Sequence, residues 1–120
     1  GHRLGIKEEV TPYEDLLFWS SIYDYKNFEN VLKRVGLKNY KFLKCKYLSQ
    51  GQKQRLAISR LLVSKKSIWL LDEPISSLDK EGITLLKELI GEHNKFGGIA
   101  VISSHNNFLK KYDFHINMDK

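Results

Sequence analysis

Residues 68–73 read Ile-Trp-Leu-Leu-Asp-Glu, four apolar side chains followed by two carboxylates. A short apolar run that ends in charge is typical of a strand buried on both faces of a parallel sheet. Open α/β folds bind ligands at the carboxyl edge of such a sheet, where carboxylates suit Mg²⁺. The stretch therefore predicts a strand with a candidate magnesium ligand, Asp72, and a candidate proton acceptor, Glu73. A strand that simply ends in solvated acids would have the same pattern.

The residues that follow repeat the alternation of helix and strand that a parallel sheet requires. Residues 79–96 carry an apolar stripe at helical spacing that extends to Phe96. A Gly-Gly pair ends this helix, and residues 99–102 form a second apolar run. Residues 106–118 predict a short helix and a third, more peripheral strand. The order predicts right-handed βαβ connections and an α/β fold.

The residues before the first strand predict helices. Thr11 and Glu14 have capping-box spacing, and Pro12 is tolerated in a first turn, so a helix begins there. Gly36 is the stop signal of a second, shorter helix. The basic and aromatic residues after it have no clear period and predict a loop or short turns. The expected helices span residues 11–23, 28–35 and 49–64.

Composition excludes several classes of protein. The chain has 120 residues, 42% of them hydrophobic and 28% charged, which suits one globular domain. Its longest apolar runs have four residues. A membrane span needs roughly 18, so we expect neither a span nor a signal peptide. The single cysteine, Cys45, excludes an internal disulfide and fits a reducing compartment.

Positive charge is concentrated in one part of the chain. The formal net charge is +6, but the residues between Glu29 and Asp72 include eleven basic side chains and no acidic one. We call these residues the basic block. The rest of the chain holds nine basic and fourteen acidic side chains. The block indicates nucleic acid or an anionic membrane surface as a partner, or else the solvated face of a helical region.

Residues 48–52, Leu-Ser-Gln-Gly-Gln, precede the third expected helix. Ser49 and Gln52 have the spacing of an S-x-x-Q capping box, which needs no ligand. The same serine hydroxyl, a glycine that allows close approach and the free amides of a helix start also form an anion site. The pattern leaves both interpretations open.

Four short motifs together resemble those of the ATP-binding-cassette (ABC) ATPases in order and spacing. The family's signature, Walker B, D-loop and switch-histidine motifs correspond to LSQGQ at 48–52, IWLLDE at 68–73, SSLD at 76–79 and SSH at 103–105. The resemblance implies an α/β fold, the P-loop NTPase (ABC ATPase) fold lacking its N-terminal part. Such a fold has a helical subdomain and a short parallel sheet with flanking helices.

In that fold, residues 1–66 would form the Q-loop region, the helical subdomain and the signature helix. Residues 67–120 would form the C-terminal half of the RecA-like core, so that the whole is one truncated ABC ATPase domain. The chain contains no Gly-Lys pair and hence no G-x-x-x-x-G-K-[ST] P-loop, the main cradle for the α- and β-phosphates. We therefore expect this chain by itself to bind ATP poorly and to hydrolyse it negligibly.

The resemblance further implies ATP and Mg²⁺ as cofactors and gives roles to individual residues. Asp72 would help to hold Mg²⁺, Glu73 would polarise the attacking water, and His105 would contact the γ-phosphate. Asp79 would cross the interface to a second ATPase subunit, unless it merely caps its helix. His2 falls at the position of the Q-loop glutamine, a candidate metal ligand, unless Gly-His is a tag remnant. The residues that would bind the γ-phosphate of ATP held by the second subunit are Ser49, Gln50, Gly51 and Gln52.

A narrower resemblance comes from residues 1–11, GHRLGIKEEVT. They are similar to GHQPGIKxELT in the haem-exporter ATP-binding subunits of cytochrome c maturation. This resemblance implies a peripheral ATPase on the cytoplasmic face of the inner membrane. Its implied partners are transmembrane subunits of the transporter and, indirectly, a haem chaperone, and no nucleic acid is expected.

Two other functions stay open at this point. A soluble ABC-class ATPase that acts on nucleic acid or ribosomes would explain the basic block. Against it, only 46 positions separate His2 from Leu48 and they contain no heptads. The long coiled coil of the DNA-repair and chromosome relatives therefore has no room. A non-enzymatic basic binding module would leave four ordered motifs as coincidence.

Overall fold

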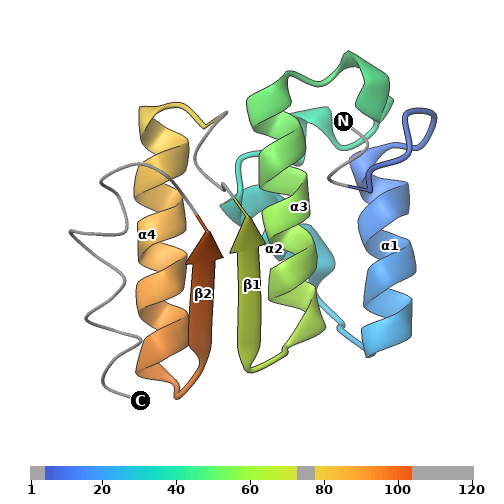
Figure 1. The fold of residues 1–120 in the computed structure, drawn as a ribbon. Coiled ribbons are helices and arrows are strands. Elements are labelled where there is room, and N and C mark those ends of the chain that lie inside the picture. Colours follow the sequence, from blue (N-terminus) through green and yellow to red (C-terminus); the bar gives the residue numbers. More distant parts are fainter. Residues whose placement is uncertain (1–4, 73–77, 104–120) are drawn as a thin grey trace. The chain divides into compact units, whose positions relative to one another are not determined.

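The computed structural model of the chain describes residues 5–72 and 78–103 (Figure 1). The contacts divide the chain into two compact units, residues 1–65 and residues 66–120, which we call the helical unit and the sheet unit. In the described residues no helix is both long and apolar enough to cross a membrane. The elements in chain order are α1 (Pro12–Tyr23), α2 (Phe28–Arg34), the 3-10 helices η2 (Lys38–Tyr40) and η3 (Cys45–Tyr47), α3 (Gln50–Ser64), β1 (Ile68–Asp72), α4 (Lys80–Lys95) and β2 (Ile99–Ser103).

Local interactions determine where α1 begins and where α2 ends. Thr11 Oγ1 accepts a hydrogen bond from the Glu14 amide (3.1 Å), and Glu14 Oε1 accepts one from the Thr11 amide (2.9 Å). The predicted capping box is thus confirmed. α2 ends before Gly36, whose φ of +79° lies in the left-handed region. A Cβ at Gly36 would meet only the end of the flexible Arg55 side chain, so the backbone conformation is what favours glycine.

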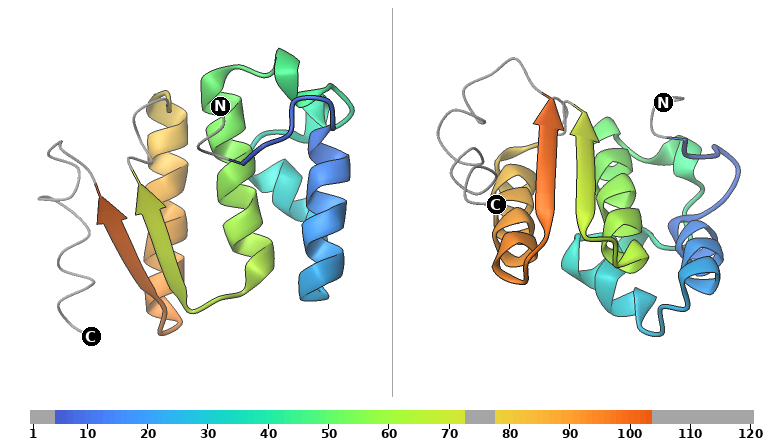
Figure 2. Two further views of the ribbon diagram at one scale, coloured as in Figure 1. Left: turned by 45° about the vertical axis from the view of Figure 1, so that its right-hand side comes forward. Right: turned by 60° about the horizontal axis from the view of Figure 1, so that its bottom comes forward.

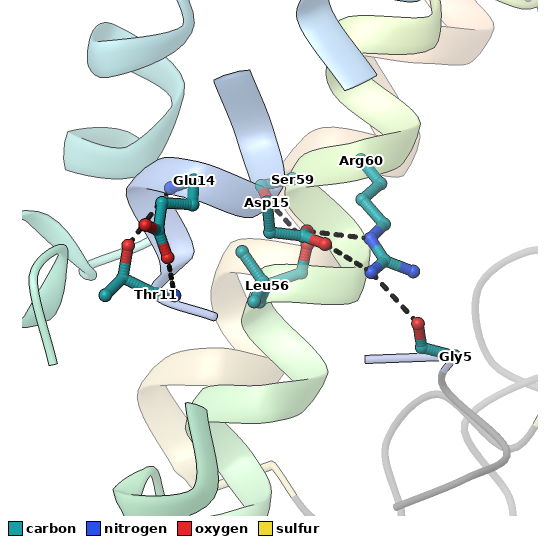
Figure 3. Close-up of polar contacts among 7 residues, drawn as sticks. All are labelled: Gly5, Thr11, Glu14, Asp15, Leu56, Ser59 and Arg60. Carbon is teal, nitrogen blue, oxygen red and sulfur yellow. Dashed lines mark hydrogen bonds and ion pairs between the residues drawn. The ribbon is translucent and has the colours of Figure 1, made fainter. Parts of the chain in front are cut away.

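In the helical unit, α1 and α3 are joined by a largely buried ion pair (Figure 3). Arg60 of α3 donates from Nε and Nη2 to the two carboxylate oxygens of Asp15 of α1, at 2.9 and 2.6 Å. The two side chains are 19% and 7% exposed. Arg60 Nη2 also donates to the Gly5 carbonyl at 3.2 Å, and the guanidinium lies 5.4 Å from the centre of the Trp19 ring. The buried aliphatic side chains of the helical unit include Leu16, Leu32, Val35, Leu37, Leu56 and Val63.

In the sheet unit, β1 and β2 lie side by side and point the same way (Figure 2). Ile68 lies opposite Ile99, and Asp72 lies opposite Ser103. Successive side chains of a strand point to opposite faces. One face is buried and carries Trp69, Leu71, Ala100 and Ile102, whereas Ile68, Leu70 and Val101 are exposed on the other, Leu70 by 73%. The prediction of a strand buried on both faces is therefore wrong for the described residues, because α4 covers one face only.

α4 begins with a side-chain cap, and a histidine holds it to the strands. Asp79 Oδ1 accepts a hydrogen bond from the Gly82 amide at 2.8 Å, which begins the helix. His93 Nε2 lies 3.0 Å from the Ser67 carbonyl and 3.2 Å from the Ile99 carbonyl. Its ring stacks on that of Trp69, with 3.8 Å between the ring centres. The last turn of α4 is thus tied to the starts of both strands.

One expected member of the apolar stripe of α4 does not belong to it. The helix ends at Lys95, and Phe96 is its C-cap with 86% of the residue exposed. Because the backbone leaves the helix at this point, the ring does not continue the helical face that the spacing predicted. The predicted elements within residues 106–118 lie outside the described residues.

We predict that replacing Asp15 by alanine lowers the free energy of unfolding of the helical unit by about 3 kcal/mol, because Arg60 would keep a largely buried charge without its partner. Urea denaturation followed by circular dichroism measures this loss. The matched control is Lys26→Ala, which removes an ion pair with Asp24 whose side chains are 84% and 86% exposed. That control is expected to cost less than about 1 kcal/mol. Equal losses in the two variants would contradict a special role of the Asp15–Arg60 pair.

We also predict that Gly98→Ala destabilises the sheet unit by about 2 kcal/mol, because the added Cβ would overlap the His93 ring. The control is the double variant Gly98→Ala/His93→Ala. Removing the imidazole relieves the overlap, so the two changes should be strongly non-additive in denaturation experiments. Simple additivity would show that the two residues do not interact in this way.

Candidate functional site

One candidate site, in the helical unit, is the start of α3. Ser49 is the N-cap, and its Oγ accepts a hydrogen bond from the Gln52 amide at 3.1 Å. Gln52 Oε1 accepts one from the Ser49 amide at 2.8 Å, which completes the capping box. The structural interpretation of the S-x-x-Q pattern is therefore confirmed. The capping box uses only some of the polar groups at the start of α3. Other groups there stay available to a ligand, so capping and ligand binding are compatible.

The groups left over at this helix start fit an anion. The amides of Gln50 and Gly51 belong to the first turn, where a helix has no internal partner for them. They donate no hydrogen bond to any other residue within 5–72 and 78–103. Ser49 and Gln50 are exposed, and the first turn of α3 contains no acidic side chain. A serine hydroxyl, two free amides and the positive end of the helix dipole are suited to a phosphate oxygen.

A separate candidate site, in the sheet unit, lies at the carboxyl edge of the two strands. Asp72 is the last residue of β1 and pairs in register with Ser103, the last residue of β2. Asp79 caps α4 through its side chain, so the capping interpretation of this residue is confirmed as well. Mg²⁺ in proteins takes one or two carboxylates and completes its shell with phosphate oxygens and water. A strand-end aspartate at this edge fits that requirement.

The other residues that the sequence singled out fall outside the described part of the chain. They are His2, Glu73 and His105. Of the candidate site residues, the structure places Ser49, Gln50, Gly51 and Gln52 together at the start of α3. It places the backbone of Asp72 at the end of β1 and Asp79 at the start of α4.

The electrostatics of the helical unit differ from what the basic block suggested. Acidic residues that precede the block in the sequence, and Glu29 at its border, pair with five of its members. Hydrogen bonds and charge from Lys46 and Lys44 hold the pKa of Glu9 below its usual range. Local sequence patterns contain no signal for such long-range pairs. The pairs are Lys41–Glu29, Lys44–Glu9, Lys46–Glu9, Lys53–Glu8 and Arg60–Asp15.

Cys45 lies just before the start of α3 but takes no part in the site. The residue is buried and its thiol is free. Burial raises the pKa of this thiol to about 11. The thiolate, which is the nucleophilic form, is therefore scarce at neutral pH.

Comparison with known families identifies the class of protein. The family model described as ABC transporter matches residues 2–76, more than half of the chain, and the chain belongs to this family. A solved structure described as the ATP binding subunit of an ABC transporter has a TM-score of 0.79 at 23% identity. It covers 90% of this chain and 48% of that one. The predicted ABC ATPase fold is thereby confirmed.

Curated relatives narrow the resemblance to one kind of ABC protein. The chain is 39% identical over 108 residues to the cytochrome c biogenesis ATP-binding export protein CcmA of Aliivibrio fischeri. It is 43% identical over 109 residues to the protein of the same name from Dechloromonas aromatica. Each match covers 88% of this chain and 53% of the relative. The chain thus spans about half the length of the curated relatives it matches, and its predicted similarity to the ATP-binding subunits of cytochrome c maturation is confirmed.

We predict that Ser49→Ala lowers the free energy of unfolding by about 1 kcal/mol, because the Gln52 amide would lose its cap. The control is Ser21→Ala, a serine on the exposed side of α1 whose hydroxyl bonds to the Leu17 carbonyl. Alanine favours helix there, so little or no loss is expected. Thermal or urea denaturation compares the two. A Ser49 variant as stable as the Ser21 variant would contradict the capping role.

Proposed function

We propose that this chain forms part of the ATP-binding subunit of an ABC transporter that exports haem for cytochrome c maturation. The observation that carries the proposal is the identity of 39 and 43% to two cytochrome c biogenesis export proteins over 88% of the chain. The start of α3 supports it, because Ser49 and the free amides of Gln50 and Gly51 fit a phosphate group.

In this proposal, residues 1–66 provide the Q-loop region, the helical subdomain and the signature helix, and residues 67–120 provide the Walker B, D-loop and switch-histidine half of the core. α3 is then the signature helix. Its first residues would bind the γ-phosphate of ATP held by a second ATPase subunit, and Asp79 would lie at the interface with that subunit. The residues assigned to this contact are Ser49, Gln50, Gly51 and Gln52.

Hydrolysis in this proposal depends on residues at the ends of the two strands. Glu73 would orient and deprotonate the attacking water, and His105 would donate a hydrogen bond to the γ-phosphate. Asp72, together with His2 at the Q-loop position, would hold Mg²⁺. When bound, this ion neutralises negative charge on the phosphates. Because these 120 residues contain no Gly-Lys pair, and hence no P-loop, they would by themselves bind ATP poorly and hydrolyse it negligibly.

The proposed partners are transmembrane subunits of the transporter, and a haem chaperone that is affected indirectly. The protein would act at the cytoplasmic face of the inner membrane as a peripheral subunit. The alternative, a soluble ATPase that acts on nucleic acid or ribosomes, rested on the basic block. Five basic side chains of that block are paired with acids, which weakens this alternative.

We predict that Glu73→Gln in the complete protein lowers ATP turnover by roughly 10²- to 10⁴-fold and preserves ATP binding, because the glutamine cannot accept the proton of the attacking water. Phosphate release from the reconstituted complex measures ATP turnover, and nucleotide titration measures ATP binding. Export is measured by the formation of c-type cytochromes in cells that lack their own ATP-binding subunit of this transporter. The matched control is Glu88→Gln, an exposed residue of α4. Undiminished turnover in the Glu73 variant would remove this residue as the base. Normal turnover without rescue of cytochrome formation by the unaltered protein would contradict the haem-export assignment.

A further inference from the structure

The helical unit contains a basic hollow that the proposed function does not use. It has a volume of about 220 Å³, and α2 and η2 contribute most of its lining. Lys41 forms an ion pair of 2.8 Å with Glu29, the one carboxylate among the lining residues. Lys33 and Lys38 are exposed and have no ion pair with any residue that the structure describes. The hollow is lined by Glu29, Asn30, Leu32, Lys33, Lys38 and Lys41.

Exposed apolar side chains lie directly beside this hollow. Lys41 Nζ, which lines it, is 5.2 Å from the centre of the Phe42 ring and 5.9 Å from that of Tyr13. The Tyr13 and Phe42 ring centres are 5.3 Å apart. Phe42 is nevertheless 69% exposed, and its neighbours Tyr40 and Leu43 are also exposed. We call the three exposed side chains Tyr40, Phe42 and Leu43 the apolar ridge, and Lys41 joins its Phe42 to the basic hollow.

This combination matches the chemistry of an anionic membrane surface. Aromatic and aliphatic side chains gain free energy when they leave water for the boundary between headgroups and acyl chains. Lysines beside them meet the phosphates, each contributing attraction to an anionic leaflet. A nucleic acid fits less well, because Leu43 cannot stack on a base and the Phe42 ring already contacts Tyr13 and Lys41.

We propose that the hollow binds the phosphate of an anionic phospholipid headgroup while the apolar ridge enters the membrane interface. Two unpaired ammonium groups, Lys33 and Lys38, face the phosphate, and Lys41 positions the Phe42 ring beside it. This contact would attach the helical unit to lipid directly, in addition to any contact with transmembrane subunits. It does not depend on ATP.

The test is co-sedimentation of the complete purified protein with vesicles of phosphatidylcholine, with or without phosphatidylglycerol. We expect binding only when phosphatidylglycerol is present. Lys38→Glu and Phe42→Ser should each lower the vesicle partition coefficient by roughly tenfold, because one reverses a charge in the hollow and the other removes the ring that enters the interface. The matched control, Lys26→Glu, makes the same charge change at a side chain that is 84% exposed in another part of the helical unit, and should lower it by less than about threefold.

Several outcomes would overturn the proposal. They are equal binding to neutral vesicles, equal losses in the Lys38 and Lys26 variants, and unchanged binding in the Phe42 variant. If millimolar inorganic phosphate displaced the protein from the vesicles, the hollow would be a site for a soluble phosphate and not for a lipid headgroup. Oligonucleotide binding with the same dependence on Lys38 would assign it to nucleic acid. Circular dichroism and the ATP turnover of each variant, both expected to be unchanged, separate loss of lipid binding from misfolding and from failure of the proposed ATPase function.

Discussion

The helical unit depends on one interaction, the ion pair between Asp15 and Arg60. Its two residues are 45 positions apart, and both side chains are largely removed from water, so each charge is compensated mainly by the other. The same guanidinium bonds the Gly5 carbonyl and lies over the Trp19 ring. The pair thereby joins α1, α3 and the segment before α1. In the proposed function, where α3 is the signature helix, this pair would also help to place the helix start that binds phosphate.

The charge of the chain shows how folding changes the meaning of a sequence pattern. Eleven basic residues without an acid between them resemble a surface for a polyanion. In the folded helical unit, acids from residues 8–15 and Glu29 neutralise much of this charge. Lys33 and Lys38 have no acidic partner among the described residues, and they line one hollow with Lys41, whose ammonium group lies 5.2 Å from the centre of the exposed Phe42 ring. The basic hollow with its apolar ridge involves fewer basic residues and more apolar ones than the basic block of the sequence indicated.

The confirmed predictions depend on residues close together in the sequence. The wrong ones depend on contacts between distant elements, or on where a helix ends. The capping boxes of Thr11 and Ser49 join residues three positions apart, so the sequence contains both partners side by side. The burial of β1 on both faces was wrong, because burial depends on which elements cover the sheet, and α4 covers one face. Phe96 followed the helical spacing, but the helix ended one residue earlier. The catalytic roles of Glu73 and His105 stay predictions.

The sequence by itself determined the family, the order of the elements and the helix starts, because motif spacing and capping are properties of neighbouring residues. It also predicted the cap at the start of α3, which the structure confirms, whereas the anion site at the same residues stays a prediction. Only the tertiary structure decided which charges neutralise one another, which face of the sheet is buried, and where lysines and aromatic rings meet on the surface. The physical reason is that these features arise between segments far apart along the chain, whose proximity exists only after packing.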